Sequence, residues 1–201
     1  SGANVVLTAQ NGANFQGCKR MWWGITVQNG AAVKMTGAQI KQAYAGLKFV
    51  PGANTSGSEL QNCFLEDNLF GLFAYNFSVS NPLKFGKFSG NTIQASINAL
   101  LSPPAGMTYN GVKPWRGIWL LNCNADLATG ASTFNKVKGY RYGMVASNAN
   151  VTLANCRFDS NYGDPQAFDL NDGVDIFADQ SNLSVGGFAN QQCRFSNTRN
   201  A

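Results

Sequence analysis

Short runs of alternating apolar and polar residues, each opened by a glycine, recur along the whole chain. Alternation with a period of two indicates β-strands, because successive side chains of a strand point to opposite faces. The runs share the form Gly-apolar-x-apolar: Gly24-Ile25-Thr26-Val27, Gly46-Leu47-Lys48-Phe49, Gly71-Leu72-Phe73-Ala74, Gly117-Ile118-Trp119-Leu120, Gly143-Met144-Val145-Ala146 and Gly173-Val174-Asp175-Ile176. We therefore expect six equivalent strands in one register, with the apolar pair of each run facing a core.

The spacing of these glycines predicts a solenoid. They are 22, 25, 46, 26 and 30 residues apart, and intervals of about 20 to 30 residues suit one turn of a chain in which each repeat packs on its neighbours. The single long interval predicts an inserted loop, which we place at residues 94–114.

A second motif gives each turn its corners. Its copies are Val33-x-Met35-x-x-Ala38-x-Ile40-x-x-Ala43, Leu60-x-x-Cys63-x-Leu65-x-x-Asn68, Leu83-x-x-Gly86-x-Phe88-x-x-Asn91 and Val151-x-Leu153-x-x-Cys156-x-Phe158-x-x-Asn161. Small or polar residues interrupt the alternation at fixed places, as expected where strands are joined by bends. We expect Asn68, Asn91 and Asn161 to stack as an asparagine ladder.

The cysteines fit the same arrangement. Cys63, Cys156 and Cys193 are expected in one internal row, a strand spacing of about 4.8 Å apart, which approaches the range that a disulfide can bridge. Buried free thiols are the preferred interpretation, because the chain has an odd number of cysteines, 5, and because Ala or Gly occupies the same place in other turns.

The motif Cys18-x-x-Met21-Trp22-x-Gly24-Ile25-x-Val27, with the Cys/Ala-x-Phe/Ile-x-x-Asn/Ala units that follow it, resembles the repeats of large secreted proteins of Bacteroidetes-type bacteria. The resemblance covers nearly the whole chain. It implies an all-β fold, a right-handed parallel β-helix (a pectate-lyase-like solenoid) of about six to seven turns, and a location outside the cell or on its surface. The repeats of that family are structural and imply no catalytic residue.

We expect residues 1–201 to form a single β-helix domain cut from a longer protein. The chain begins inside a strand pattern at Asn4-Val5-Val6-Leu7 and ends within the second motif, near Cys193. An open final turn of a solenoid presents unpaired strand edges, so neighbouring domains or further turns of the parent chain are the expected partners.

Charge and composition exclude several classes of protein. The 15 basic and 10 acidic residues, for a net charge of +5, are scattered singly, without the basic run that would follow a nucleic-acid backbone. No apolar stretch reaches the roughly 18 residues of a membrane span. Histidine and CxxC pairs are absent, which argues against a zinc site and leaves no cofactor expected apart from calcium, considered below.

The outward positions carry the candidate binding surface. By alternation they form two rows: Thr26, Lys48, Phe73, Trp119, Val145 and Asp175 in one, and Gln28, Val50, Tyr75, Leu121, Ser147 and Phe177 in the other. Phe73, Tyr75, Trp119 and Leu121 should form one apolar patch on adjacent turns, which indicates a binding partner. Aromatic side chains suit sugar rings, and Lys48 with Gln28 and Asn122 offers hydrogen bonds to hydroxyls.

The inserted loop leaves a second interpretation open. It carries Leu100, Leu101 and Met107 and emerges beside the same strands, so it could fold over the aromatic residues. In that case the chain would be a purely structural stalk.

An enzyme acting on acidic polysaccharide is a further alternative. Only the segment from Asp169 to Asp179 gathers carboxylates, with Asp172, Asp175 and Asp179 as candidate catalytic residues. Asp169, Asn171 and Asp175 are also candidate calcium ligands, but Gln180 stands where an EF-hand loop would place glutamate. The run Asn171-Asp172-Gly173 is equally typical of an ordinary turn.

The leading hypothesis is therefore a non-catalytic extracellular module for adhesion or display. It would bind polysaccharide or another surface component through Lys48, Phe73, Tyr75, Trp119 and Leu121. The positive net charge favours a polyanionic ligand.

Overall fold

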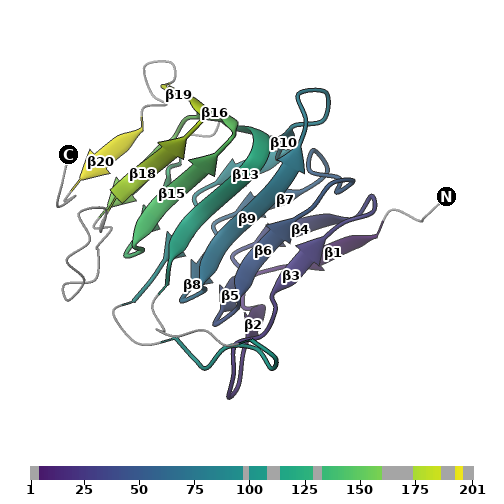
Figure 1. Ribbon diagram of the computed structural model, residues 1–201. Coiled ribbons are helices and arrows are strands. Elements are labelled where there is room, and N and C mark those ends of the chain that lie inside the picture. The colour runs from purple at the N-terminus through teal and green to yellow at the C-terminus, as the bar shows by residue number, and fades with distance from the viewer. Residues whose placement is uncertain are drawn as a thin grey trace.

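The computed structural model describes residues 5–96, 100–107, 114–128, 133–159, 174–186 and 193–196. Regular structure within these ranges consists of β-strands in three parallel sheets. Within each sheet the strands lie side by side in order from the N-terminal end of the molecule to the C-terminal end (Figure 1). The same ranges contain no helix, and so none that is long and apolar enough to cross a membrane.

The strands fall into three sheets. The four-stranded sheet has the order β1 (Val6–Ala9), β4 (Ala32–Thr36), β7 (Glu59–Gln61), β11 (Lys87–Ser89). The seven-stranded sheet has the order β2 (Asn14–Gln16), β5 (Gln39–Lys41), β8 (Phe64–Glu66), β12 (Thr92–Gln94), β14 (Asn135–Lys138), β17 (Cys156–Asp159), β20 (Arg194–Ser196).

The nine-stranded sheet has two arms, because β13 is long enough to bend from one into the other. Its long arm contains β3 (Ile25–Val27), β6 (Ala45–Phe49), β9 (Phe70–Phe77), β13 (Arg116–Leu127), β15 (Tyr142–Ser147) and β18 (Val174–Asp179). Its short arm contains β10 (Leu83–Lys84), the C-terminal half of β13, β16 (Asn150–Leu153) and β19 (Asn182–Val185).

Consecutive strands belong to different sheets or to different arms of the nine-stranded sheet, and each strand pairs with its equivalent one turn away. From β3 the chain passes through β4 and β5 before β6 pairs with β3, in the register Val27↔Phe49. The next turn repeats this order, and β9 pairs with β6 through Phe49↔Ala74. The observed all-β fold with parallel strands is compatible with a parallel β-helix, as the repeat predicts.

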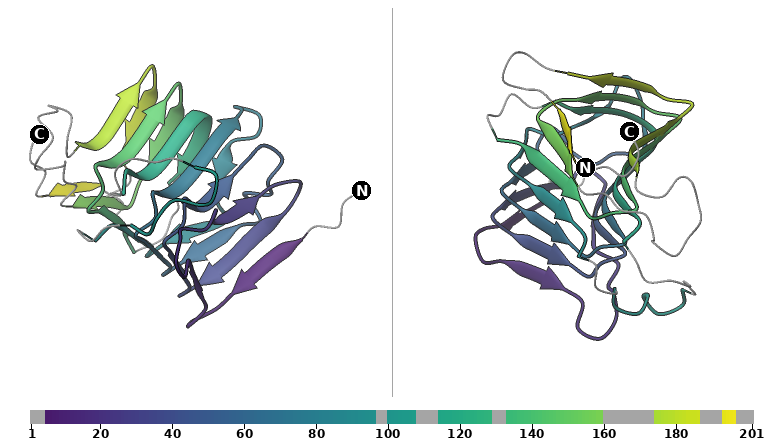
Figure 2. Two further views of the ribbon diagram at one scale, coloured as in Figure 1. Left: turned by 60° about the horizontal axis from the view of Figure 1, so that its bottom comes forward. Right: turned by 90° about the vertical axis from the view of Figure 1, so that its left-hand side faces the viewer.

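One apolar core lies between the three sheets. Figure 2 shows the arrangement of these sheets from two further directions. Leu47 and Phe49 of the long arm are fully buried, as their alternation predicts. Leu60 of the four-stranded sheet and Leu65 of the seven-stranded sheet join them in the same cluster. Full burial of such a side chain contributes about 1.5 to 3 kcal/mol, so stacked rows of them account for much of the driving force.

The bends between sheets explain why asparagine and glycine are so frequent. Asn29, Asn122 and Asn148 have positive φ values of 52°, 48° and 48°, and each stands at the bend where the chain leaves the long arm. Asparagine enters this left-handed region more readily than most residues, and glycine enters it without strain. At the bend into the seven-stranded sheet, Gly37 and Asn62 have φ values of 62° and 52°.

The predicted ladder of Asn68, Asn91 and Asn161 is wrong in its membership. Asn91 lies opposite Cys63, because Thr92 pairs with Phe64, and Asn68 therefore occupies a different bend. The observed buried ladder joins Asn91 to Asn135, whose Oδ1 accepts a hydrogen bond of 2.9 Å from Asn91 Nδ2. Asn161 lies outside the described residues.

The internal row of cysteines exists but is interrupted. Cys63 and Cys156 share a row in which Asn91 and Asn135 stand between them, because Thr92 pairs with Lys136 and Asn135 with Cys156. Cys193 lies next to Cys156, one strand over, since Arg157 pairs with Arg194. All the cysteines are free thiols.

The predicted register of the last run is also wrong, by two residues. Met144 pairs with Ile176 rather than with Val174, so Asp175 occupies the place that Gly143 holds in the preceding turn. Phe177 then falls in the outward row of Trp119 and Val145, and Asp179 follows Ser147.

Cross-strand ion pairs occupy the outer surfaces of two sheets. On the four-stranded sheet Glu59 lies between Lys34 and Lys87, at 3.4 Å and 3.1 Å. On the seven-stranded sheet Glu66 lies 2.6 Å from Lys41. Pairs of opposite charge on neighbouring strands are typical of a sheet surface that faces water.

The Glu66 pair predicts a small acid-dependent loss of stability. Its hydrogen bond and charge interaction with Lys41 lower the pKa of Glu66, aided by a bond from Gln94. A lowered carboxyl pKa gives stability that is present above the unfolded-state value, near 4, and is lost as the pH falls through the folded-state value. We expect Glu66→Gln to remove about 0.5 kcal/mol of this acid sensitivity.

Thermal unfolding of both proteins between pH 7 and pH 3 measures the effect. The gap in melting temperature between wild type and Glu66→Gln should close as the pH falls. A gap that is constant over this range would contradict a stabilising charge on Glu66.

Candidate functional site

Register in the long arm places the predicted binding residues side by side. Lys48 pairs with Phe73 and Phe73 with Trp119, so these side chains occupy one outward row on β6, β9 and β13. Tyr75 pairs with Leu121 in the next outward row. We call the surface formed by Lys48, Phe73, Tyr75, Trp119 and Leu121 the aromatic face.

The rings of the aromatic face stack on one another. The ring centroids of Phe73 and Trp119 are 4.4 Å apart with an interplanar angle of 17°. Tyr75 stacks on Phe73 at 5.5 Å and 28°. Phe73 is therefore enclosed between neighbours and only 9% exposed, whereas Tyr75, Trp119 and Leu121 remain partly exposed.

Basic side chains lie over the rings. Lys48 Nζ is 5.7 Å from the centroid of Phe73 and 5.3 Å from that of Tyr75. The guanidinium of Arg116, which sequence reasoning did not single out, lies 4.1 Å from the Trp119 ring and 4.2 Å from the Trp115 ring. Such cation–π contacts contribute about 0.5 to 2 kcal/mol each and hold two positive charges at the aromatic face.

The inserted loop covers one side of this surface. The connection between β12 and β13 spans residues 95–115, and within it Leu100 is 5% exposed and packs in the cluster that contains Phe70 and Phe73. Leu101 donates a backbone hydrogen bond of 2.9 Å to Gln42 Oε1. The described part of the loop therefore buries Phe70 and leaves Tyr75, Trp119 and Leu121 partly open to solvent.

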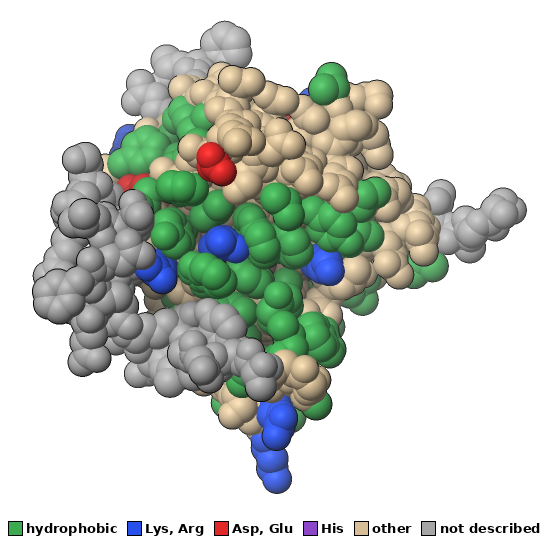
Figure 3. Space-filling model, in the orientation of Figure 1, with side chains coloured by type: hydrophobic (Ala, Val, Ile, Leu, Met, Phe, Trp, Pro, Cys, Tyr) green, Lys and Arg blue, Asp and Glu red, His purple; other side chains and the backbone are tan. Residues whose placement is uncertain are grey.

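The outer surface of the long arm is thus apolar, whereas the outer surfaces of the four-stranded and seven-stranded sheets carry ion pairs. Figure 3 shows hydrophobic side chains gathered over this arm, with basic side chains set among them. Phe177, which is 41% exposed, extends the apolar row on β18. Asp179 pairs with Ser147, so its carboxylate stands at the β18 end of the other outward row, which contains Leu121.

The acidic candidates do not come together as a pair. Asp175 is expected to face outward but is buried, at 8% exposed, and Asp179 on the same strand is exposed. Four residues of extended strand separate them by roughly 13 Å, which exceeds the separation of about 5 to 9.5 Å in glycosidases. The other candidate positions, Asp172 for catalysis and Asp169 and Asn171 for calcium, lie outside the described residues.

A metal centre finds no support in the described ranges. Within them, no group of three or more His, Cys, Asp and Glu side chains could hold a metal ion. Calcium binding by the segment around Asp169 stays a prediction.

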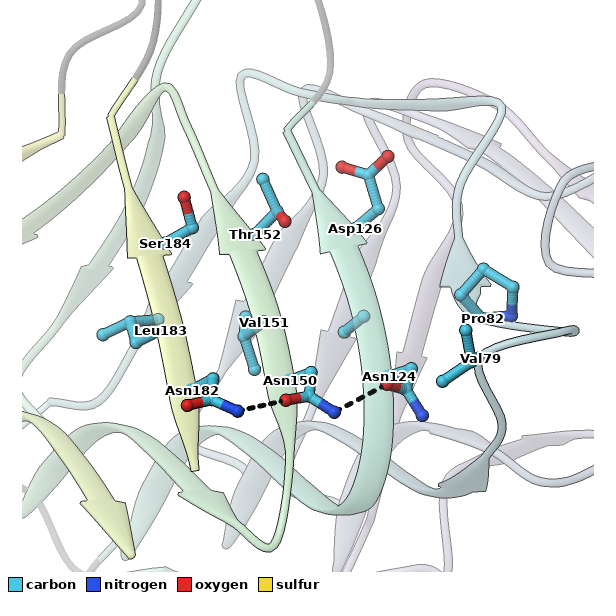
Figure 4. A pocket seen from close by; sticks show the side chains of 11 residues that line it. Val79, Pro82, Asn124, Asp126, Asn150, Val151, Thr152, Asn182, Leu183 and Ser184 are labelled. Carbon is cyan, nitrogen blue, oxygen red and sulfur yellow. Dashed lines mark hydrogen bonds between the residues drawn. The ribbon is translucent and has the colours of Figure 1, made fainter. Parts of the chain in front are cut away.

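A second surface was not anticipated from the sequence. A groove of about 460 Å³ lies over the short arm, and we call it the amide groove. Its lining residues come from β13, β16, β19 and the segment before β10: Val79, Pro82, Asn124, Ala125, Asp126, Asn150, Val151, Thr152, Asn182, Leu183 and Ser184 (Figure 4). The signal for it was the recurrence of asparagine at equivalent positions, which only the true register reveals.

Comparison of the chain with known protein families, with curated proteins and with solved structures found no match. The chemistry of the aromatic face and the amide groove is therefore the basis on which a function can be assigned.

Proposed function

We propose that this chain is a right-handed parallel β-helix of about six to seven turns from a secreted or cell-surface bacterial protein of the Bacteroidetes type. In this proposal it is a non-catalytic module, and its aromatic face binds a polyanionic polysaccharide or a surface component of that chemistry. Neighbouring domains of the parent protein would complete its role in adhesion.

The observation that carries the proposal is the contrast between the outer surfaces. Glu59 and Glu66 are each paired with lysines across strands, as suits a surface that meets only water. The aromatic face instead exposes parts of Tyr75, Trp119 and Leu121. A rigid sheet that leaves such side chains open indicates a partner.

The charges beside the rings favour an anionic partner. Lys48 and Arg116 contact aromatic rings, and no salt bridge to Lys48 is found among the described residues. The charge of Lys48 is available to carboxylate or sulfate groups of a glycan. The apolar edges of Trp119 and Tyr75, with Leu121, would contact the CH groups of the sugar rings.

A lysine substitution tests the proposal. Lys48→Gln should weaken binding of a hexamer of galacturonic acid by about tenfold, which corresponds to about 1.4 kcal/mol. The measurement is isothermal titration calorimetry at low salt, and raised salt should weaken the wild type more than the variant. Trp119→Leu should weaken binding as well, since it removes the largest partly exposed ring of the aromatic face.

Lys34→Gln is the matched control, because it removes the same charge from the four-stranded sheet. It should bind the hexamer as the wild type does. Equal weakening by Lys34→Gln would show that only net charge matters, and a wild type that binds no anionic glycan would reject the proposal.

A further inference from the structure

The amide groove is polar, whereas the aromatic face is apolar. The two surfaces share the strand β13. Trp119 and Leu121 lie on the long-arm half of β13, and Asn124 and Asp126 lie on its short-arm half. Asn122, at the bend between them, has a φ of 48°. The groove therefore faces a different direction and offers a separate binding surface.

Three asparagines on neighbouring strands line the groove in one row. Asn124 pairs with Asn150 and Asn150 with Asn182 in the parallel register. Asn182 Nδ2 donates to Asn150 Oδ1 at 2.8 Å, and Asn150 Nδ2 donates to Asn124 Oδ1 at 2.9 Å (Figure 4). Asn124 Nδ2 in turn donates to the carbonyl of Phe77 at 3.0 Å.

These hydrogen bonds fix the orientation of the amides but do not use all of their donors and acceptors. A side-chain amide has two N–H donors and an oxygen with two lone pairs, and a ladder uses one donor and one lone pair of Asn150. The second donor and the second lone pair of this exposed side chain remain for a ligand. A fixed donor and acceptor thus recur at a strand spacing of about 4.8 Å.

A second polar row runs parallel to the amides. Asp126, Thr152 and Ser184 pair with one another two residues further along the same strands, which is roughly 6.5 Å away. Figure 4 shows these side chains and the asparagines on the same side of the strands, with Val79 and Pro82 at one end. The groove volume of about 460 Å³ falls within the range of about 300 to 1,000 Å³ that is typical of ligand sites.

The charge of the groove differs from that of the aromatic face. Among the described residues that line it, Asp126 is the only charged one, and Lys84 Nζ lies 3.0 Å from Asp126 Oδ2. An anionic ligand would meet Asp126, and a cationic ligand would have to compete with Lys84. Amides and hydroxyls in fixed rows instead suit the hydroxyl groups of a neutral sugar, which both donate and accept.

We propose that the amide groove binds a neutral glycan strand that crosses β13, β16 and β19. The amide row of Asn124, Asn150 and Asn182 would hold successive hydroxyl groups, and Val79 and Pro82 would contact the apolar side of a sugar ring. This site is independent of the proposed function, because the aromatic face selects an anionic ligand and shares none of these side chains.

Calorimetric titration with neutral hexasaccharides tests the proposal, using hexamers of glucose, mannose and xylose in β-1,4 linkage. Wild-type protein should bind at least one of them, and Asn150→Ala should weaken that binding at least tenfold. Ser184→Trp, which fills the groove from an exposed position and leaves the amide row intact, should abolish it.

Two controls separate this site from its surroundings. Asn148→Gly removes the hydrogen bond to Asn122 at the neighbouring bend, and glycine accepts the positive φ of 48° there, so binding should be unchanged. Trp119→Leu should also leave neutral binding unchanged.

Three results would overturn the proposal. They are a wild type that binds none of the neutral hexamers, an Asn150→Ala protein that is folded and binds as tightly as the wild type, and a Trp119→Leu protein that loses neutral binding. The first two results do not bear on the galacturonic acid experiment, so the two proposals can fail separately; the third would assign neutral binding to the aromatic face instead of the amide groove.

Discussion

Replacement of Gly117 by alanine is expected to lower the free energy of unfolding by about 3 kcal/mol, because a methyl group has no space there. A Cβ atom on Gly117 would lie 2.6 Å from the carbonyl oxygen of Gly143 and closer still to Cγ1 of Val137. The oxygen belongs to the backbone and the methyl to a buried β-branched side chain, so neither can withdraw easily. Thermal unfolding should show a melting temperature lower by roughly 6 to 12 °C.

Gly186→Ala is the control for this substitution. A Cβ atom on Gly186 would meet nothing within 4 Å, so its stability should stay within about 0.5 kcal/mol of the wild type. A Gly117→Ala protein as stable as Gly186→Ala would show that the long arm can separate from the seven-stranded sheet at this bend without cost.

The same contacts explain why the glycine repeat predicted the long arm. Gly46, Gly71 and Gly117 stand in one row, where a Cβ on each would meet the carbonyl oxygen of the next glycine in the row. This limit on side-chain size applies at each of these turns, so glycine recurs at regular intervals in the sequence. The alternation that follows each glycine predicted the inward side chains for the same reason.

The register of the last run, which begins at Gly173, could not be predicted from this pattern. Alternation has a period of two, so a shift of two residues leaves every inward position inward. Gly173-Val174-Asp175-Ile176 satisfies the motif, yet Ile176 rather than Val174 pairs with Met144. The shift moves Asp175 from the place beside Val145 to the place beside Gly143, and Asp175 is buried there although the alternation predicts an outward direction.

The aromatic face was predicted and the amide groove was not, and the difference lies in sequence distance. Trp119 and Leu121 directly follow the glycine that marks their run, so their outward direction follows from the alternation alone. Asn124, Asn150 and Asn182 are 26 and 32 residues apart, beyond a bend whose position the motif does not mark. Only the register of the short arm shows that they meet.

Oxidation is expected to join Cys156 and Cys193 and to stabilise the C-terminal end by roughly 4 kcal/mol, from the lost loop entropy of the unfolded chain. The two residues are neighbours on the paired strands β17 and β20. A hydrogen bond between the thiols raises the pKa of Cys156 and lowers that of Cys193 to about 7. Cys193 is therefore the nucleophile, and with oxidised glutathione it forms a mixed disulfide that Cys156 resolves, releasing two molecules of glutathione.

Peptide mapping by mass spectrometry identifies the bridge, and thermal unfolding before and after oxidation measures its effect. The rate of bridge formation should rise as the pH passes 7, because the thiolate of Cys193 is the reactive form. The melting temperature of the oxidised protein should rise by roughly 8 to 16 °C. Cys156→Ser should show neither the bridge nor the rise.

Cys63, the other cysteine of the same internal row, makes this prediction specific. Cys63 is separated from Cys156 by Asn91 and Asn135, so a bridge between the two would need a different stacking of the turns. Burial also raises the pKa of Cys63, which disfavours its thiolate. A Cys63–Cys156 peptide would contradict the observed stacking of the turns between β8 and β17, and an oxidised protein no more stable than the reduced one would contradict the expected stabilisation.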